Sequence, residues 1–338
     1  MRGGGYGISM DHHIYHDIIT IENLLATWKG FLSGKRHKKD VADFELHLAE
    51  HLASLHTDLL HRTYSHGGYS EFHVSDPKRR TIHKATVRDR LLHHLLYRTL
   101  SPYFENRFIY DSYACRKGKG IHRALDRFRT FAGAISLNHT RTCYVLKCDI
   151  KKFFASVDQR ILKNILGRHV EDEGILWLLD QVIDSFQVST AGLGLPLGNL
   201  TSQLLANVYM HELDRFVKHE LHLRWYIRYA DDFIILGNSI SELDRVRINI
   251  QSFLRDRLHL LLHENKVDIC TYSSGVDFLG WIHFPHYRQI RTVTRRRLTR
   301  RLRGFPPRET INSYRGLLRH GSTHTLMETI HAFNAPLG

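Results

Sequence analysis

Three aspartates in the middle of the chain stand where short apolar runs end. Asp231 and Asp232 separate the runs RWYIRY and FIILG, a pattern typical of a β-hairpin. Asp149 ends the run VLKCD, whose apolar character predicts a buried strand next to that hairpin. We therefore expect the three carboxylates to converge on one edge of a sheet.

Clustered carboxylates repel one another unless cations lie between them, so the three aspartates predict a metal site. Mg²⁺ is held in proteins by a few carboxylates together with substrate phosphates. Two such ions about 4 Å apart can activate an attacking 3′-hydroxyl and stabilise a leaving pyrophosphate. We expect two Mg²⁺ ions, for which Mn²⁺ could substitute, and nucleotidyl transfer as the chemistry. The alternative is that Asp231 and Asp232 only form a hairpin turn.

The charge of the chain indicates a polyanion as its partner. Its 48 lysines and arginines exceed its 34 aspartates and glutamates by 14. No acidic residue lies between Asp277 and Glu309. If residues 294–303 are helical, three arginines of this stretch share one face: Arg296, Arg300 and Arg303. Leu298 and Leu302 can then face a core, which suits a helix that grips phosphates, whereas a solvated basic face is the alternative.

The composition is that of a globular protein, with 42% apolar and 11% aromatic residues over 338 positions. We expect no contact with a membrane and a cytoplasmic location, since no apolar run is long enough to span a bilayer. The four cysteines form no CxxC pair and are expected to be reduced. Residues 1–9 are glycine-rich and precede Met10, so they are a flexible lead or an overextended start.

Apolar periodicity predicts mixed helices and strands, the pattern of an α+β fold. Helices are expected at 15–30, 41–61, 85–104, 159–168, 173–186, 200–222, 241–258 and from 294 onward. Strands are expected at 72–74, 144–150, 266–271 and 276–283, besides the hairpin around Asp231. The elements that must position the carboxylates are thus the strand 144–150 and this hairpin.

The sequence YADDF at 229–233 resembles the catalytic signature of reverse transcriptases, and other motifs of that family follow in the same order. CDIKKFF at 148–154 resembles the first palm motif, and GLPLGNLTSQLLANVYMHELD at 194–214 resembles the next. HENKV and VDFLGW at 276–281 resemble a later palm motif and the primer grip. DPKRRTIHKATVRDRLLHHLL at 76–96 and SYACRKGKGIHRAL at 112–125 resemble fingers segments.

The resemblance implies roles for residues at matching positions. The metal ligands are Asp149, Ile150, Asp231 and Asp232. Lys266 assists departure of pyrophosphate, and Phe154 excludes a ribose 2′-hydroxyl. The incoming dNTP and the template pocket are contacted by Lys78, Arg80, Arg116, Ile150, Phe154, Leu197 and Gly198. The nucleic acid is contacted by Tyr229, Phe278, Leu279, Gly280, Arg296, Arg300 and Arg303.

The resemblance also implies a right-hand polymerase fold with fingers, palm and thumb. After a flexible lead at 1–14, residues 15–140 are mainly fingers. Residues 141–285 are mainly palm, an antiparallel sheet packed on helices, together with the primer grip, and residues 286–338 are a helical thumb. The implied partners are a template RNA, a DNA or RNA primer and dNTPs.

Leu197-Gly198 and Ser202-Gln203 stand where most members of the family have glutamine-glycine and SP. This form is similar to the enzymes of diversity-generating retroelements, which miscopy adenines. Leucine cannot hydrogen-bond the nucleotide or template as glutamine can, so we expect error-prone synthesis. That subtype implies a basic pentameric accessory protein. The alternatives are a defence-associated or retron-like enzyme that copies a dedicated noncoding RNA, and a non-catalytic RNA-binding protein on the same fold.

Overall fold

The computed structural model describes residues 14–75, 79–187, 190–303 and 307–321. The chain divides into two compact units, each built from three separate stretches. The first unit comprises residues 1–109, 150–216 and 252–261, and the second comprises residues 110–149, 217–251 and 262–338. Both units mix helices with antiparallel strands, which confirms the predicted α+β class.

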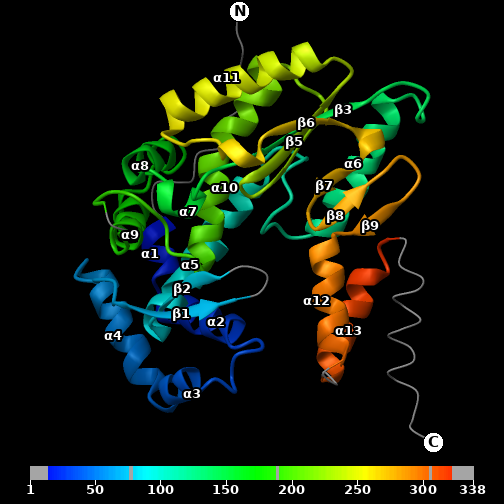
Figure 1. Cartoon of the computed structure of the whole chain (residues 1–338). Coiled ribbons are helices and arrows are strands. Elements are labelled where there is room, and N and C mark those ends of the chain that lie inside the picture. The colour runs from blue at the N-terminus through cyan, green and yellow to red at the C-terminus, as the bar shows by residue number, and fades with distance from the viewer. Residues whose placement is uncertain (1–13, 76–78, 188–189, 304–306, 322–338) are drawn as a thin grey trace, which may run out of the picture. The chain divides into compact units, whose positions relative to one another are not determined.

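The first unit is mainly helical and is built around two long helices, α5 and α10. Thr86 caps α5 by accepting a hydrogen bond from the amide of Asp89, and both helices bury their leucines against each other. A hairpin of β1 and β2 precedes α5 (Figure 1). The bounds are α1 Ile14–Ile18, α2 Ile21–Phe31, α3 Lys39–Leu46, α4 Leu48–Leu60, β1 Tyr69–Val74, β2 Arg80–Ala85, α5 Val87–Glu105, α7 Phe153–Ser156, α8 Gln159–Gly167, α9 Glu173–Asp184 and α10 Leu200–Arg215.

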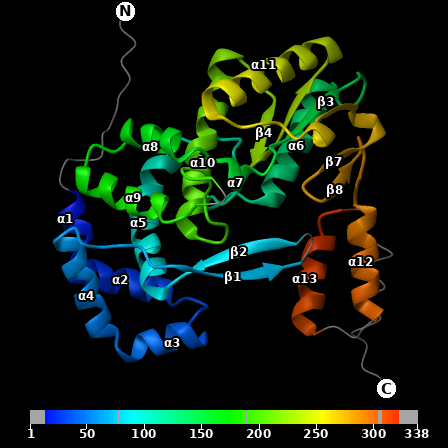
Figure 2. The same cartoon turned by 60° about the vertical axis from the view of Figure 1, so that its left-hand side comes forward.

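The second unit contains a four-stranded antiparallel sheet in the order β4-β5-β3-β6 and a three-stranded sheet in the order β7-β8-β9. Helix α6 packs on β4 and β5 (Figure 2). The bounds are α6 Ile121–Ile135, β3 Tyr144–Asp149, β4 Tyr226–Tyr229, β5 Asp232–Gly237, β6 Asp268–Thr271, β7 Val276–Phe278, β8 Trp281–His283, β9 Arg288–Ile290, α12 Thr292–Arg303 and α13 Arg308–Leu318. Helix α11, Ile240–Leu258, begins in this unit and ends in the first.

One hydrophobic core holds the second unit together. It joins Phe128 of α6, Ile227 and Ile234 of the larger sheet, Trp281 of the smaller sheet and Leu298 of α12. These apolar side chains come from five elements, so the core joins both sheets of the unit to α6 and α12. The carboxylates at the end of β3 and at the start of β5 therefore belong to a sheet that this core supports.

Most predicted elements are present, but the bounds of several differ from the prediction. The helix predicted at 41–61 is broken at His47, whose φ of −117° is not helical. The helix predicted at 200–222 is α-helical only to Arg215 and continues as a π-helix, Phe216–Glu220. The strand predicted at 276–283 is a hairpin, because Leu279 and Gly280 adopt left-handed φ angles of 49° and 88°.

The helix predicted at 15–30 is also two helices, α1 and α2, and the helices and strands that were not predicted include β2, α6, α7 and β9. The spacing of Leu125, Phe128 and Ala132 in α6 is nevertheless that of an amphipathic helix. Among the described helices, none is both long and apolar enough to cross a membrane.

Candidate active site

The pairing of β3, β4 and β5 brings the predicted carboxylates together. Tyr229 of β4 pairs with Asp232 of β5, so Ala230 and Asp231 form a two-residue turn. Asp232 in turn pairs directly with Asp149 at the end of β3. Opposite residues on neighbouring strands have Cβ atoms about 5 Å apart and project from the same face. The second unit therefore carries Asp149, Asp231 and Asp232 at one sheet edge, as predicted.

Asp232 is only partly exposed to solvent. Its Oδ1 atom is buried and has no hydrogen-bond partner among the described residues. Burial is the main reason why the pKa of Asp232 is raised to about 6; the charges of Asp149 and Asp231 act in the same direction, and those of Lys147 and Arg291 oppose the shift. A buried carboxylate oxygen without a partner costs free energy, which a bound cation would recover.

A lysine provides a positive charge beside the acids. The Nζ atom of Lys266 donates to Oδ1 of Asp149 at 2.7 Å, and the backbone amide of His263 donates to the Asp149 carbonyl oxygen at 2.8 Å. Lys266 lies in a 3₁₀ turn, Glu264–Lys266, and its side chain is 36% exposed. It can therefore be reached from solvent while it neutralises one of the three acids.

The donor set fits divalent cations that prefer oxygen ligands. Asp232 supplies an unused buried oxygen, and Asp149 and Asp231 supply carboxylates on either side of it. In the part of the chain that the structure describes, no group of three or more His, Cys, Asp or Glu side chains is arranged so that it could hold a metal ion by itself. The three aspartates would hold the predicted ions. The side chain of Ile150 is a hydrocarbon without a donor atom, so only the backbone carbonyl of this residue could be a ligand.

Sequence analysis did not single out Arg228, which supports the turn Ala230-Asp231 between β4 and β5. Its side chain has no exposure, and it donates to the Ala230 carbonyl oxygen at 3.1 Å and to Oγ of Ser112 at 3.0 Å. Ala230 needs this support because its φ of 57° is left-handed, which is unfavourable for a residue with a Cβ. The signal that the sequence offered was the position of Arg228, a cation inside an otherwise apolar strand.

Gly198 lies in the first unit, on a loop held against β2. The amide of His83 donates to the Leu197 carbonyl oxygen at 2.9 Å, and Nδ2 of Asn199 donates to the His83 carbonyl oxygen at 3.1 Å. Gly198 has a φ of 112°, and a Cβ there would lie 2.6 Å from Cγ2 of Ile82. Glycine is therefore required by both conformation and space.

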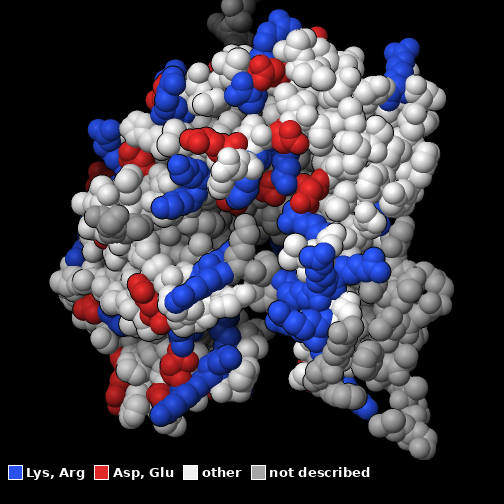
Figure 3. All heavy atoms as spheres, viewed as in Figure 1, with Lys and Arg blue, Asp and Glu red and all other residues white. Residues whose placement is uncertain are grey.

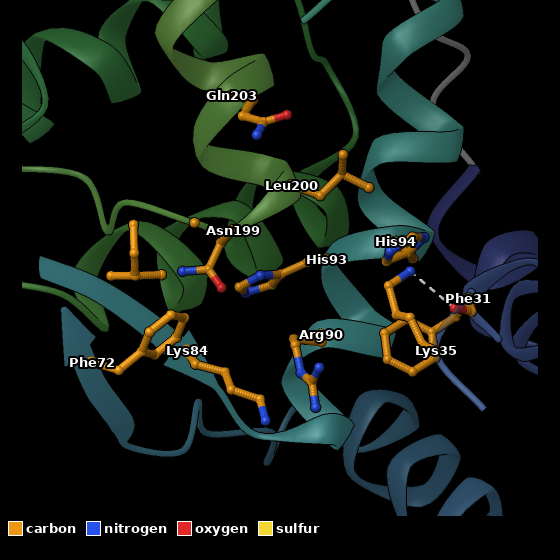
Figure 4. Close-up of a pocket in the computed structure, with 12 residues that line it drawn as sticks. Phe31, Lys35, Phe72, Lys84, Arg90, His93, His94, Asn199, Leu200 and Gln203 are labelled. Atoms are coloured by element: carbon orange, nitrogen blue, oxygen red, sulfur yellow. Dashed lines mark hydrogen bonds between the residues drawn. The ribbon is translucent and has the colours of Figure 1, made fainter. Parts of the chain in front are cut away.

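A cavity of about 400 Å³ adjoins this loop in the first unit (Figure 4). Gly198 and Asn199 line it on one side. Three cations line it as well, from α5, β2 and the segment after α2: Lys35, Lys84 and Arg90. Asp40 accepts from both Lys84 and Arg90, so the positive charges of this group exceed the negative by two. The cavity suits an anionic ligand such as a nucleic-acid backbone.

The remaining residues of the predicted dNTP pocket are divided between the two units. Arg80 is exposed at the start of β2, and Phe154 is half-buried in α7, its ring edge-on to that of Phe153. Arg116 belongs to the second unit, where its Nη1 atom donates to the Ser112 carbonyl oxygen at 2.9 Å. Lys78 lies outside the described residues.

The predicted nucleic-acid contacts all belong to the second unit. Phe278 is fully buried, Leu279 and Gly280 form the turn between β7 and β8, and Tyr229 packs partly buried against the core. Arg296 and Arg300 are exposed on α12, and Leu298 and Leu302 are buried, as predicted for an amphipathic helix. The end of α12 is Arg303, whose side chain lies outside the described part. Figure 3 shows Lys and Arg side chains gathered over α12.

Several known proteins are similar to this chain in sequence or in fold. The family model described as reverse transcriptase (RNA-dependent DNA polymerase) matches residues 75–283, more than half of the chain. Protein YkfC of Escherichia coli is 26% identical over 245 residues, which cover 61% of this chain and 63% of that protein. The group II intron-encoded protein LtrA of Lactococcus lactis is 24% identical over 272 residues, 60% of this chain and 44% of LtrA.

The chain thus spans less than two thirds of the length of either relative. Among solved structures, an apo telomerase from Candida tropicalis, truncated of its C-terminal domain, has a similar fold. The TM-score is 0.51 with 13% identity over 68% of this chain and 55% of the telomerase, so the likeness concerns the fold alone. The match to the family model, together with the aspartates that the fold collects, shows that the chain belongs to the reverse transcriptase family.

Proposed function

We propose that the chain is an RNA-directed DNA polymerase that extends a DNA or RNA primer on an RNA template from dNTPs. The observation that carries this proposal is the pairing of Asp149 with Asp232 beside the turn that holds Asp231. Two divalent cations, Mg²⁺ or in its place Mn²⁺, would supply activation of the primer 3′-hydroxyl and stabilisation of the leaving pyrophosphate. Asp149, Asp231, Asp232 and the carbonyl of Ile150 would hold them.

The residues of the chain itself have roles that follow from charge and position. Lys266, already beside Asp149, can transfer its hydrogen bond to a departing pyrophosphate as negative charge develops there. Lys78, Arg80 and Arg116 offer cations for the triphosphate of the incoming dNTP. The ring of Phe154 would exclude nucleotides that carry a 2′-hydroxyl, because no polar group replaces the water that this hydroxyl loses.

The template and primer would be held by different segments. Leu197 and Gly198 would line the pocket for the templating base, and Phe278, Leu279 and Gly280 would support the primer end together with Tyr229. Arg296, Arg300 and Arg303 of α12 would contact phosphates, which fixes the register of a duplex without reading its sequence. The exposed arginines of α12 support this assignment.

Within the family, we assign the chain to the diversity-generating retroelement type, with error-prone synthesis from a retroelement template RNA. Leu197 supports this assignment, since an aliphatic side chain discriminates by shape alone. The type carries with it a basic pentameric accessory protein as partner. A cytoplasmic location is consistent with the four cysteines, all of which are free thiols. The competing function is that of a defence-associated or retron-like enzyme that copies a dedicated noncoding RNA.

Primer extension on an RNA template with Mg²⁺ tests the proposal, with the products sequenced and errors sorted by template base. Asp231→Asn should abolish extension, whereas Asp43→Asn, at an exposed position of α3, should retain it. Errors concentrated opposite adenine would support the retroelement assignment, and accurate products would favour the defence-associated or retron-like function. Absence of extension by the wild-type protein, even with cellular RNA and candidate accessory proteins, would favour a binding-only protein.

A further inference from the structure

The second unit contains another cavity, of about 420 Å³, which the proposed polymerase chemistry does not use. We call it the α6 cavity, because one of its walls is the face of α6 that carries Arg127 and Phe131. Its other walls are the segment 218–225 and Asp111. Trp225 directly precedes β4, and the turn Ala230-Asp231, the catalytic turn of the proposed polymerase, follows the other end of that strand. Trp225 and Tyr229 are four positions apart along the extended chain, a distance of roughly 13 Å, so the α6 cavity is distinct from the carboxylate site.

Positive charge exceeds negative charge in this cavity. Its lining includes three cations, Arg127, Lys218 and Arg224, and a single carboxylate, Asp111. Nε of Arg127 donates to Asp111 at 2.8 Å, and Nζ of Lys218 lies 3.6 Å from the same carboxylate. Asp111 is nearly buried, so it orients the two cations but cannot offset all three charges. The excess charge favours an anionic ligand.

Flat side chains stand among these cations. The guanidinium of Arg224 lies over the Trp225 ring, 4.5 Å from its centroid, and that of Arg127 lies 4.3 Å from the centroid of Phe131. The two rings meet edge to face at 5.0 Å. Proteins that bind single-stranded nucleic acids combine such planar surfaces with cations, because bases stack on rings and guanidinium groups while phosphates pair with charge.

The local backbone is unusual on the same side of the cavity. Lys218 lies in the five-residue π-helix Phe216–Glu220, and His222 follows with a left-handed φ of 52°. π-Helices are rare and occur frequently at functional sites. Here the wider turn carries Lys218 to the Arg224 carbonyl oxygen, to which its Nζ donates at 2.7 Å. The loop that bears Arg224 and Trp225 is thereby fixed before any ligand arrives.

We propose that the α6 cavity binds one nucleotide of single-stranded RNA, with its phosphate on Arg127, Lys218 and Arg224 and its base stacked against the Arg224 guanidinium and Trp225. RNA as the ligand rests on the proposed polymerase function. The site would hold a part of the RNA that is not being copied. It is also linked to the catalytic turn, because the Asp111 carbonyl oxygen accepts from the amide of Arg228, whose side chain supports Ala230.

Binding of a fluorescein-labelled twelve-nucleotide oligouridylate, measured by anisotropy against salt concentration, tests the charge contribution. Arg224→Gln should weaken binding about fivefold and lower the slope of log K against log salt by about 0.7, the value for one phosphate contact on a single strand. The matched control is Arg245→Gln, which removes an exposed arginine of α11 in the same unit and should change neither quantity. Equal effects of the two substitutions would overturn the proposal.

Photo-crosslinking with the same oligonucleotide carrying 4-thiouridine locates the contact. Crosslinked peptides should include residues 218–225 in the wild-type protein and equally in Asp231→Asn, since the site does not depend on catalysis. Crosslinks confined to other segments would overturn the proposal, even if the wild-type protein extends primers. Crosslinks at 218–225 in a protein that extends no primer would instead retain the RNA site and reject the polymerase.

Discussion

The guanidinium of Arg228 donates to the carbonyl oxygen of Ala230 at 3.1 Å, from a side chain that has no contact with solvent. Burial of a charge is expensive unless it is met by several hydrogen bonds. Arg228 also donates to Oγ of Ser112, and its backbone exchanges hydrogen bonds with Asp111 and Tyr113. A buried cation thus supports, from behind, the turn in which Ala230 has a left-handed conformation.

Replacement of this cation should damage both folding and catalysis. Arg228→Met leaves the Ala230 carbonyl oxygen and Ser112 with one partner fewer, and we expect a loss of about 2–3 kcal/mol in the free energy of unfolding. A shift of about 1 Å at the turn can lower kcat about 100-fold. Urea unfolding and primer extension measure the two effects. Exposed Arg245, changed to Met, should leave both unaltered. If kcat survives the loss of stability, Arg228 is a folding residue and does not position the turn.

The carboxylate cluster could be predicted from sequence because its determinants are local. Asp149 ends the apolar strand β3 and Asp232 begins the apolar strand β5, and antiparallel pairing of such strands leaves little freedom in where these two acids meet. Arg228 could not be predicted to hold Ala230, because strand alternation alone leaves a cation in a short strand free to face solvent. The partner that buries it, Ser112, is 116 residues away in sequence.

The hairpin of β7 and β8 is a second feature that could not be predicted from the sequence pattern. Val276 to His283 reads as one apolar strand, and only the left-handed angles of Leu279 and Gly280 divide it. Gly280 was a visible signal for a turn, but leucine strongly disfavours positive φ, so the pattern favoured continuity. Packing of Phe278 and Trp281 into the common core, which sequence periodicity does not describe, stabilises the turn.

Lys266 should matter for catalysis far more than for folding. Its ion pair with Asp149 is partly exposed, and such pairs contribute about 0–1 kcal/mol. Lys266→Met should therefore change the free energy of unfolding by less than about 1 kcal/mol. Loss of a positioned donor that acts on developing charge should lower kcat at least about tenfold. Lys266→Arg should recover part of the rate, and exposed Lys29→Met provides the control. A purely structural lysine would give the reverse pattern, with stability lost and kcat kept.

Gly198→Ala should be destabilising for two separable reasons. The φ of 112° disfavours any Cβ, and the new Cβ would lie 2.6 Å from Cγ2 of Ile82. We expect a loss of about 2–4 kcal/mol in the free energy of unfolding. The double variant Gly198→Ala/Ile82→Ala should avoid the steric clash. Its loss in the free energy of unfolding should therefore be smaller than the sum of the losses of the two single variants. Gly30→Ala, in helix α2 with open space around it, should be neutral or stabilising by up to about 1 kcal/mol. If the losses of stability of Gly198→Ala and Ile82→Ala simply add in the double variant, the clash between the new Cβ and Ile82 is ruled out.

The buried His283 should make the protein sensitive to mild acid. Burial, aided by the charge of Arg288, lowers the pKa of His283 to about 4, whereas histidine in an unfolded chain titrates near 6.5. Between these values the unfolded chain binds a proton that the folded chain does not. The stability contribution is therefore complete above about pH 6.5 and is lost as pH falls toward 4, at up to about 1.4 kcal/mol for each pH unit.

His283→Phe isolates this effect from the other acid-labile groups. Nε2 of His283 has no hydrogen-bond partner among the described residues, and the ring packs edge to face on Phe128 at 4.8 Å, so phenylalanine retains the packing. Urea unfolding at pH 7 and pH 5 should show the variant losing about 2 kcal/mol less than the wild-type protein over that interval. His37→Phe, at an exposed position, should leave the pH dependence unchanged. If the wild-type protein and His283→Phe lose the same stability between pH 7 and pH 5, His283 takes up its proton in the folded protein as well. The lost stability then arises from other groups.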